Sequence, residues 1–199
     1  GEFAAQNYMA LAGKDKGLAV LNRGLPGNNT TDGVMMLALM RSVDIGIRVD
    51  SGMALEKGSR HVFDYAIIPF GGEKELAAMN LAREGAEFAN PPYVYEPHPD
   101  RLPLKASAPC PASDELLRVE PASVVCTAVY PENGRIIARL YESEGRATAG
   151  RIVAAFALAG ARETNALLEG GRELESDSGK VVVSFRPFEI KTIALTPKT

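Results

Sequence analysis

Two histidines, His61 and His98, are the residues of this sequence best suited to metal binding or to acid–base chemistry. Neither has a second histidine, a cysteine or a pair of carboxylates beside it at metal-ligand spacing. His61 opens an alternating stretch that runs to Pro69, where a polar residue ordinarily faces water or a sheet edge. The sequence therefore predicts no self-contained metal site, and a structural role for His61.

Motifs for nucleophilic catalysis and for phosphate binding are also missing from the sequence. No Gly-x-Ser-x-Gly turn is present to expose a serine nucleophile. The Gly-Gly pairs at 71–72 and 170–171 lack the spacing of dinucleotide or phosphate-binding loops. We expect both pairs to be turns, and we expect neither serine hydrolysis nor nucleotide binding.

Carboxylates that could serve a glycosidase lie on or beside the expected strands, at Asp44, Asp50, Asp64 and Glu142. A glycosidase needs two such groups facing each other across a cleft, and spacing alone identifies no pair. Scattered acids of this kind are ordinarily solvated or salt-bridged. We therefore expect structural roles for these four residues.

Composition limits the cysteine chemistry and the class of partner. Cys110 and Cys126 fit no zinc motif, and two cysteines form no disulfide framework in a chain of 199 residues. We expect buried thiols in a reducing compartment, which favours the cytoplasm. With 22 basic and 25 acidic residues and a net charge of -3, the chain predicts no nucleic-acid partner and no polybasic membrane patch.

Signals for targeting are absent from the printed sequence. No apolar run reaches the ~18 residues of a membrane-spanning helix, and no signal peptide is recognisable. The chain starts at Gly1-Glu2-Phe3 without methionine. We therefore expect the natural N-terminus to lie upstream. Asn28-Asn29-Thr30-Thr31 contains two overlapping glycosylation sequons, which we expect in a loop.

Short alternating segments recur along the whole chain between Gly, Pro and Asn clusters, and they predict an all-β, antiparallel β-sandwich fold. One exception is Glu73 to Phe88, where apolar residues three or four apart predict a single amphipathic helix. The expected strands are Asn7–Leu11, Leu18–Asn22, Val34–Arg41, His61–Pro69, Val124–Tyr130, Arg135–Tyr141, Ile152–Leu158, Lys180–Phe185 and Glu189–Leu195.

Proline density marks an expected connector between two domains. Six of the 13 prolines lie between Pro97 and Pro121, which places the expected domain boundary near residue 110. Beyond it, Asn133-Gly134 separates two alternating segments. Because a type I′ turn needs positive φ at both central residues, this pair predicts a β-hairpin.

Several segments, taken in order, resemble the C-terminal region of the glycoside hydrolase family 38 α-mannosidases. The resemblance includes a His-x-Phe-x-Tyr-Ala strand and an Asn-x-Pro exit, and the order is maintained over nearly the whole chain. The segments are Gln6–Met9, Gly17–Pro26, Leu37–Val43, His61–Ala66 with Pro69, Asn90–Pro92, Arg139–Glu142, Asn165–Glu169 and Pro187–Thr192.

In that family the nucleophile, the acid/base and the metal ligands belong to the N-terminal catalytic part. The resemblance implies that this chain alone is inactive and that its parent enzyme cleaves α-mannosides with a divalent metal, zinc being expected. It implies that residues 1–105 end the large β-sandwich and that residues 113–199 form the small terminal sandwich. The expected partners are the chain's own catalytic domain and, through it, the α-mannoside substrate, with no nucleic acid and no membrane.

The resemblance also names candidate substrate contacts. Family members reach into the sugar pocket with an arginine from a loop beyond the strand that here ends near Arg41, so Arg48 is the first candidate and Arg41 the second. A guanidinium can hold sugar hydroxyls in a fixed geometry. An ion pair of either arginine with Asp44 or Asp50 is the structural alternative. The sequence departs from the family where Gly27-Asn28 replaces the usual Glu-Tyr.

Two other functions stay open at this point. A carbohydrate-binding module would present aromatic platforms, for which the chain has no tryptophan and only Tyr93 and Tyr95 as candidates. A purely structural or adhesive β-sandwich would need no sugar enzyme attached.

Overall fold

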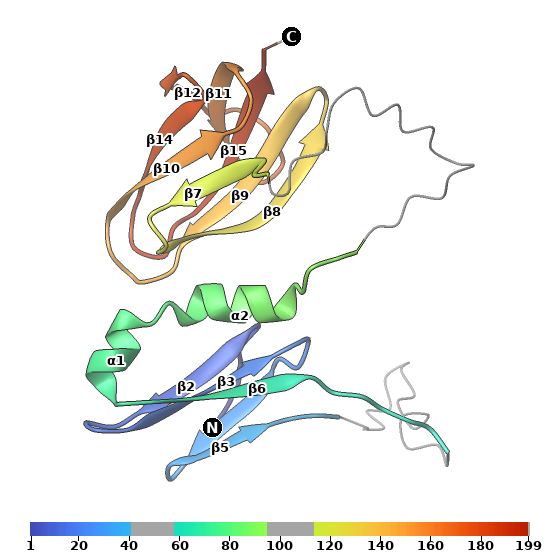
Figure 1. Ribbon diagram of the computed structural model, residues 1–199, viewed down its shortest axis with the longest axis vertical. Coiled ribbons are helices and arrows are strands. Elements are labelled where there is room, and N and C mark those ends of the chain that lie inside the picture. Colours follow the sequence, from blue (N-terminus) through green and yellow to red (C-terminus); the bar gives the residue numbers. More distant parts are fainter. Residues whose placement is uncertain (41–57, 95–113, 199) are drawn as a thin grey trace. The chain divides into compact units, whose positions relative to one another are not determined.

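The computed structural model describes residues 1–40, 58–94 and 114–198 (Figure 1). The chain divides into two compact units, residues 1–91 and 92–199. Antiparallel strands dominate both units, and the described residues contain two helices, so the predicted all-β fold is confirmed. The expected boundary near residue 110 lies outside the described residues.

The described residues of the first unit, 1–40 and 58–91, contain two three-stranded sheets with the orders β2-β3-β6 and β1-β4-β5. Both are antiparallel throughout. The six strands are β1 (Glu2–Ala4), β2 (Tyr8–Ala12), β3 (Gly17–Asn22), β4 (Gly27–Thr31), β5 (Val34–Leu37) and β6 (Tyr65–Phe70).

Two helices, α1 (Glu73–Ala78) and α2 (Leu81–Ala89), cover one face of the β2-β3-β6 sheet (Figure 1). Buried Phe70 and Leu81 form the centre of this small core. Gly17 pairs with Phe70 across the strands, and a Cβ on Gly17 would lie only 2.0 Å from Cε2 of that ring. The missing side chain of Gly17 therefore makes room for the aromatic ring.

The single helix predicted over residues 73–88 is wrong in one respect, because this segment forms two helices, α1 and α2. Met79 is extended, with ψ 140°, and Asn80 begins the second helix. Oδ1 of Asn80 accepts a hydrogen bond from the backbone N–H of Arg83 at 3.0 Å. This N-cap satisfies a donor that a new helix leaves unpaired, which is why the helical stripe is interrupted here.

The second unit is a sandwich of two antiparallel sheets with the orders β13-β14-β10-β7 and β12-β11-β15-β9-β8. Apolar side chains from both sheets meet between them, among them the buried Leu140, Ile152 and Ile193. The strands are β7 (Leu117–Glu120), β8 (Val124–Glu132), β9 (Arg135–Glu142), β10 (Thr148–Ala154), β11 (Leu158–Thr164), β12 (Arg172–Leu174), β13 (Ser176–Asp177), β14 (Lys180–Phe185) and β15 (Ile190–Pro197).

Turn chemistry agrees with the sequence in this unit. Asn133 and Gly134 have φ values of 48° and 74° and join β8 to β9, so the predicted hairpin is confirmed. Gly170 and Gly171 also have positive φ. A Cβ on Gly171 would lie 1.7 Å from the carbonyl oxygen of Glu163, so this turn requires glycine.

Three predicted strands differ clearly in their limits from the structure. The segment Ile152–Leu158 is not one strand, because β10 ends at Ala154 in one sheet and β11 begins at Leu158 in the other. The strand predicted from His61 begins only at Tyr65, since Tyr65 pairs with the last residue of β3 and no partner strand continues beyond it. Predicted strand Val34–Arg41 ends at Leu37 as β5.

The glycosylation sequons do not lie in a loop as predicted, because they form the central strand β4 of the β1-β4-β5 sheet. Asn28 is 3% exposed, and its amide nitrogen donates to the carbonyl oxygen of Pro26 at 2.8 Å. Asn28 is therefore a structural residue of the sheet.

Candidate binding surface

One face of the β2-β3-β6 sheet lies away from the helices and carries apolar side chains. Tyr65, Ile67 and Pro69 alternate with residues that face the helices, and all three are exposed. Ile67 is 56% exposed and pairs with Val20. Exposed Leu11 continues this face on β2. We call Leu11, Tyr65, Ile67 and Pro69 the apolar face.

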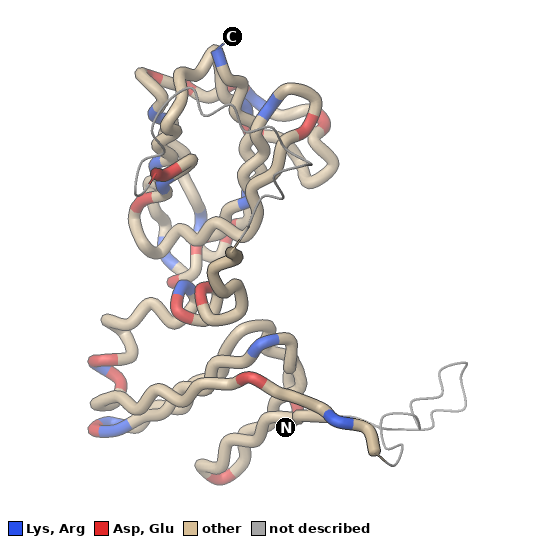
Figure 2. Tube along the Cα trace, turned by 45° about the vertical axis from the view of Figure 1, so that its right-hand side comes forward, with Lys and Arg blue, Asp and Glu red and all other residues tan. Residues whose placement is uncertain are grey.

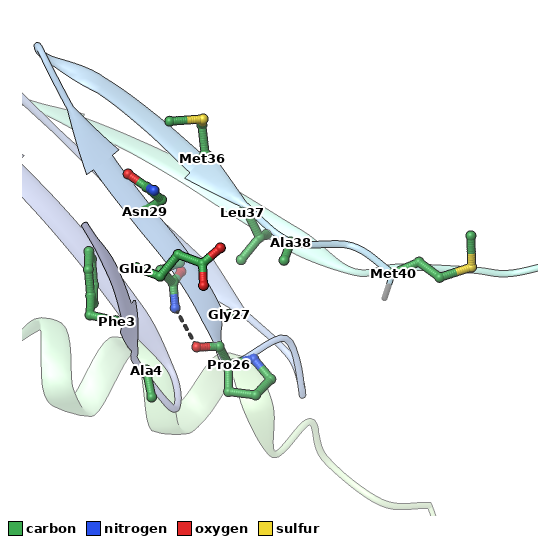
Figure 3. Close-up of a pocket in the computed structure, with 11 residues that line it drawn as sticks. Glu2, Phe3, Ala4, Pro26, Gly27, Asn29, Met36, Leu37, Ala38 and Met40 are labelled. Carbon is green, nitrogen blue, oxygen red and sulfur yellow. Dashed lines mark hydrogen bonds between the residues drawn. The ribbon is translucent and has the colours of Figure 1, made fainter. Parts of the chain in front are cut away.

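A groove of about 730 Å³ lies on the β1-β4-β5 sheet (Figure 3). Gly27 lies between Ala4 and Ala38, so small residues come together across the three strands. A Cβ on Gly27 would lie 3.0 Å from Cβ of Ala38, so glycine deepens the groove. Exposed Met36 and Met40 supply flexible apolar walls. Apolar residues form most of the lining, and Glu2, Asn28 and Asn29 are its polar members.

The groove does not test the expected substrate-contact residues. Arg41 and Arg48 lie outside the described residues, as do Asp44 and Asp50, so both the sugar contact and the ion-pair alternative stay predictions. Met40, which lines the groove, is the last described residue before Arg41.

Asp64 has a structural role, as predicted for the acids. Its Oδ2 forms an ion pair with Nη1 of Arg23 at 2.8 Å. Nε and Nη2 of Arg23 donate to the carbonyl oxygen of Phe88 at 3.0 and 2.7 Å. The guanidinium also lies 4.7 Å from the centre of the Phe88 ring. Arg23, which follows β3, thus joins the end of α2 to Asp64, which precedes β6.

His61 precedes β6, and its ring stacks on Phe63 at a centroid distance of 6.2 Å. His98 lies outside the described residues. Among residues 1–40, 58–94 and 114–198, no group of three or more His, Cys, Asp or Glu side chains could hold a metal ion.

Glu142 differs from the expected solvated or salt-bridged acid, because it is 0% exposed and backbone N–H groups surround it. Oε2 accepts from Gly145 at 2.8 Å, from Arg146 at 3.1 Å and from Phe188 at 3.2 Å, while Oε1 accepts from Glu144 at 3.0 Å. Burial of the carboxyl would raise its pKa, but the four hydrogen bonds outweigh burial and lower the pKa below its usual range. This carboxylate fixes two loops together.

A second internal charge is Lys191, whose Nζ lies 2.7 Å from Oε1 of Glu163 and 3.7 Å from Glu189. The ammonium is also 5.9 Å from the centre of the Phe185 ring. Burial alone would raise the pKa of Glu163. The hydrogen bonds and charges of Lys191 and Arg172 outweigh burial, so the pKa of Glu163 lies below its usual value. Because Glu163 lies on β11 and Lys191 on β15, the ion pair joins two neighbouring strands of one sheet.

Cys126 is a half-buried thiol whose sulfur lies 3.6 Å from the carbonyl oxygen of Ala128. Burial raises the pKa of this thiol, so it is poorly suited to nucleophilic chemistry. Cys110 lies outside the described residues. Of the two tyrosines considered as an aromatic platform for a sugar, Tyr93 is 87% exposed. Tyr95 lies outside the described residues.

Acidic and basic residues are interspersed over the described parts of both units, as Figure 2 shows. No described helix is long and apolar enough to cross a bilayer. With its apolar surfaces and its structural acids, the described part of the chain has the features of a β-sandwich module.

Comparison with known proteins identifies the family that this sandwich resembles. Residues 123–193 match the family described as "Glycosyl hydrolases family 38 C-terminal beta sandwich domain". The resemblance to the C-terminal region of family 38 α-mannosidases is thereby confirmed, and the matched segment covers most of the second unit's sandwich.

Solved structures extend the likeness of fold to nearly the whole chain. An alpha-mannosidase from Enterococcus faecalis V583 matches with a TM-score of 0.67 and 18% identity, over 98% of this chain and 21% of that chain. A protein in the glycosyl hydrolase family 38 from Enterococcus faecalis matches with a TM-score of 0.68 and 17% identity, over 98% of this chain and 22% of that one. The chain thus spans about a fifth of their length. No curated protein matches it.

Proposed function

We propose that this chain is the non-catalytic C-terminal β part of an α-mannosidase and that it buttresses the catalytic domain of that enzyme. The observation that carries the proposal is the likeness of 98% of this chain to about a fifth of a solved alpha-mannosidase. The parent enzyme hydrolyses α-mannosidic bonds, and its divalent metal, expected to be zinc, is held by the catalytic domain. In this proposal residues 1–105 end the large sandwich and residues 113–199 form the small one.

The apolar face and the groove support a packing role in the first unit. Exposed apolar patches of this kind mark interaction sites in proteins. Ile67 and its neighbours lie on a sheet whose other face the helices already cover. We propose that the catalytic domain covers the apolar face, and that the loop containing Arg48 and Arg41 completes one wall of the sugar cleft.

Dye binding tests the packing role in the isolated chain. We expect the chain to bind a hydrophobic dye or to self-associate, and we expect Ile67→Ser to reduce both. Val182→Ser is the matched control, because Val182 is exposed on β14 of the other unit. A strictly monomeric chain that binds no dye would count against the packing role.

The arginine proposal needs the complete enzyme. Arg48→Ala is expected to raise KM for an aryl α-mannoside or to lower kcat at least tenfold, as loss of a guanidinium–hydroxyl contact would. Arg60→Ala is the control, since Arg60 precedes the strand β6 and is exposed. Unchanged kinetics for both Arg48→Ala and Arg41→Ala would support the ion-pair alternative.

A further inference from the structure

In the second unit, the turn between β14 and β15 and the first residue of β15 each present a large apolar side chain to solvent. Phe188 is 68% exposed and Ile190 is 77% exposed. Single exposed apolar residues are common on protein surfaces and need no explanation. We call Phe188 and Ile190 the Phe188 tip, because its backbone and its support set it apart from such residues.

The backbone of Phe188 is in the left-handed region, with φ 56°. This conformation is unfavourable for a bulky residue, and such strain gathers at functional positions. Leu168, with φ 66°, is the other bulky residue with positive φ among the described residues, and its side chain is half-buried. Burial can compensate the strain at Leu168, whereas the mostly exposed ring of Phe188 gains little in this chain.

A buried carboxylate and a glycine lie directly beneath the Phe188 tip. The N–H of Phe188 donates to Oε2 of buried Glu142, which also holds the 144–146 loop. A Cβ on Gly145 would lie 2.5 Å from Cζ of Phe188, so the ring rests directly on that glycine. An anchor fixed in this way loses little conformational freedom when it binds.

Charges around the Phe188 tip are paired within the chain. Nη2 of Arg186 lies 2.8 Å from Oε1 of Glu189, and Arg146 forms an ion pair with Glu144. Because these charges around the Phe188 tip neutralise each other, we expect the partner surface to be an apolar pocket rather than a strongly acidic or basic surface. Buried aromatic anchors surrounded by such polar rims are typical of the centres of protein interfaces.

We propose that the Phe188 tip inserts into an apolar pocket on the catalytic part of the same polypeptide. This inference rests on the proposed function and names a second docking point besides the apolar face. The solved alpha-mannosidase is a single chain of which this one matches only 21%, so most of such an enzyme is available to provide the pocket. Glu142 is the positioning residue, because it holds the N–H of Phe188.

Hydroxyl-radical footprinting of side chains tests this inference directly. Oxidation rates of Phe188, Ile190 and Leu167 are compared between the 199-residue chain and the complete native enzyme. Leu167 is the control, because it is an exposed apolar residue on another turn of the same unit. We expect Phe188 and Ile190 to react at least fivefold more slowly in the complete enzyme, with Leu167 unchanged.

Equal rates for Phe188 in the two proteins would overturn the inference while leaving the proposed function intact. Slow oxidation of Phe188 in the isolated chain that becomes slower as the chain's concentration rises would also overturn the inference. That result would show that a second copy of the chain covers the Phe188 tip. A source protein of only about this chain's size would instead refute the proposed function.

A pair of variants separates docking from folding. Asparagine tolerates positive φ, so Phe188→Asn relieves strain while it removes the anchor. We expect a melting temperature within a few degrees of wild type in the isolated chain, but a severalfold shorter inactivation half-life in the complete enzyme. Leu167→Asn should change neither. An unchanged half-life for Phe188→Asn would contradict the inference.

Discussion

Replacing the buried carboxylate of Glu142 by an amide is the most informative perturbation of the second unit. Glu142→Gln preserves the shape of the side chain but turns one acceptor into a donor. The four N–H groups that face Glu142 accept nothing, so one of them, such as that of Glu144, loses its partner. One orphaned buried donor costs about 1–3 kcal/mol, and the three remaining bonds lose the strength that charge gives them.

The expected loss of unfolding free energy is therefore about 3 kcal/mol near neutral pH. For a unit of this size, 1 kcal/mol corresponds to about 4–8 °C, so the melting temperature should fall by ~12–24 °C. Glu173→Gln is the control, because Glu173 is exposed on β12 and its ion pair with Arg162 spans 3.7 Å. Exposed pairs of this kind contribute under ~1 kcal/mol.

Acid titration of the same variants tests the cause. The folded-state pKa of Glu142 is depressed, so its contribution is complete above the unfolded pKa of about 4.3 and is lost as pH falls through the folded value. The stability difference between wild type and Glu142→Gln should accordingly narrow below about pH 4. Denaturant unfolding of both proteins at pH 7 and at pH 3 gives this difference in unfolding free energy at each pH. A difference below ~1 kcal/mol at pH 7, or one that does not change with pH, would refute the reasoning.

Three further substitutions test other contacts by denaturant unfolding or hydrogen exchange. Gly17→Ala should destabilise the first unit by about 1–3 kcal/mol because its Cβ would meet the Phe70 ring, whereas Gly13→Ala, with its nearest atom at 3.5 Å, should be tolerated; equal effects would contradict the packing. Lys191→Met should lower the free energy of unfolding by about 1–3 kcal/mol, because Glu163 loses its closest cation. Adding Glu163→Gln to the Lys191→Met variant should recover part of that free energy, and no recovery would contradict the role of the ion pair. Arg23→Lys should speed amide exchange at the end of α2 at least severalfold, because a lysine cannot hold Phe88 and Asp64 together; unchanged exchange would show that the contact is dispensable.

Strands with strong alternation could be predicted closely from the sequence. Lys180–Phe185 has the same limits in the structure, because Val181, Val183 and Phe185 face the core in turn. The Asn133-Gly134 hairpin was predictable because its turn type depends on two residues only. Local chemistry sufficed in both cases.

Elements that depend on partners were not predictable in the same way. Strand β4 is the polar segment Gly27–Thr31, and its place between β1 and β5, rather than hydrophobic periodicity, makes it a strand. The break at Asn80 depends on a single cap that competes with a continuing helical stripe. The spacing of apolar residues over 73–88 predicts one helix, because this spacing does not show that the Asn80 cap will start a new helix.

The contacts of the buried charged residues also could not be predicted from the sequence. Glu142 lies 46 residues from Phe188 along the chain, and their hydrogen bond exists only because two loops meet at one end of the sandwich. No spacing rule predicts such a contact. Arg48 and Arg41, which the family resemblance suggests as substrate contacts, lie outside the described residues and stay predictions.

The central claim is that this chain is part of a larger mannosidase. An antibody raised against the chain would capture the native protein from its source, and two properties would be recorded: its mass and its hydrolysis of an aryl α-mannoside with and without a chelator. We predict a polypeptide several times larger than 21.2 kDa whose activity the chelator abolishes. An inactive protein of about 21.2 kDa would contradict the account and would favour a binding or purely structural sandwich.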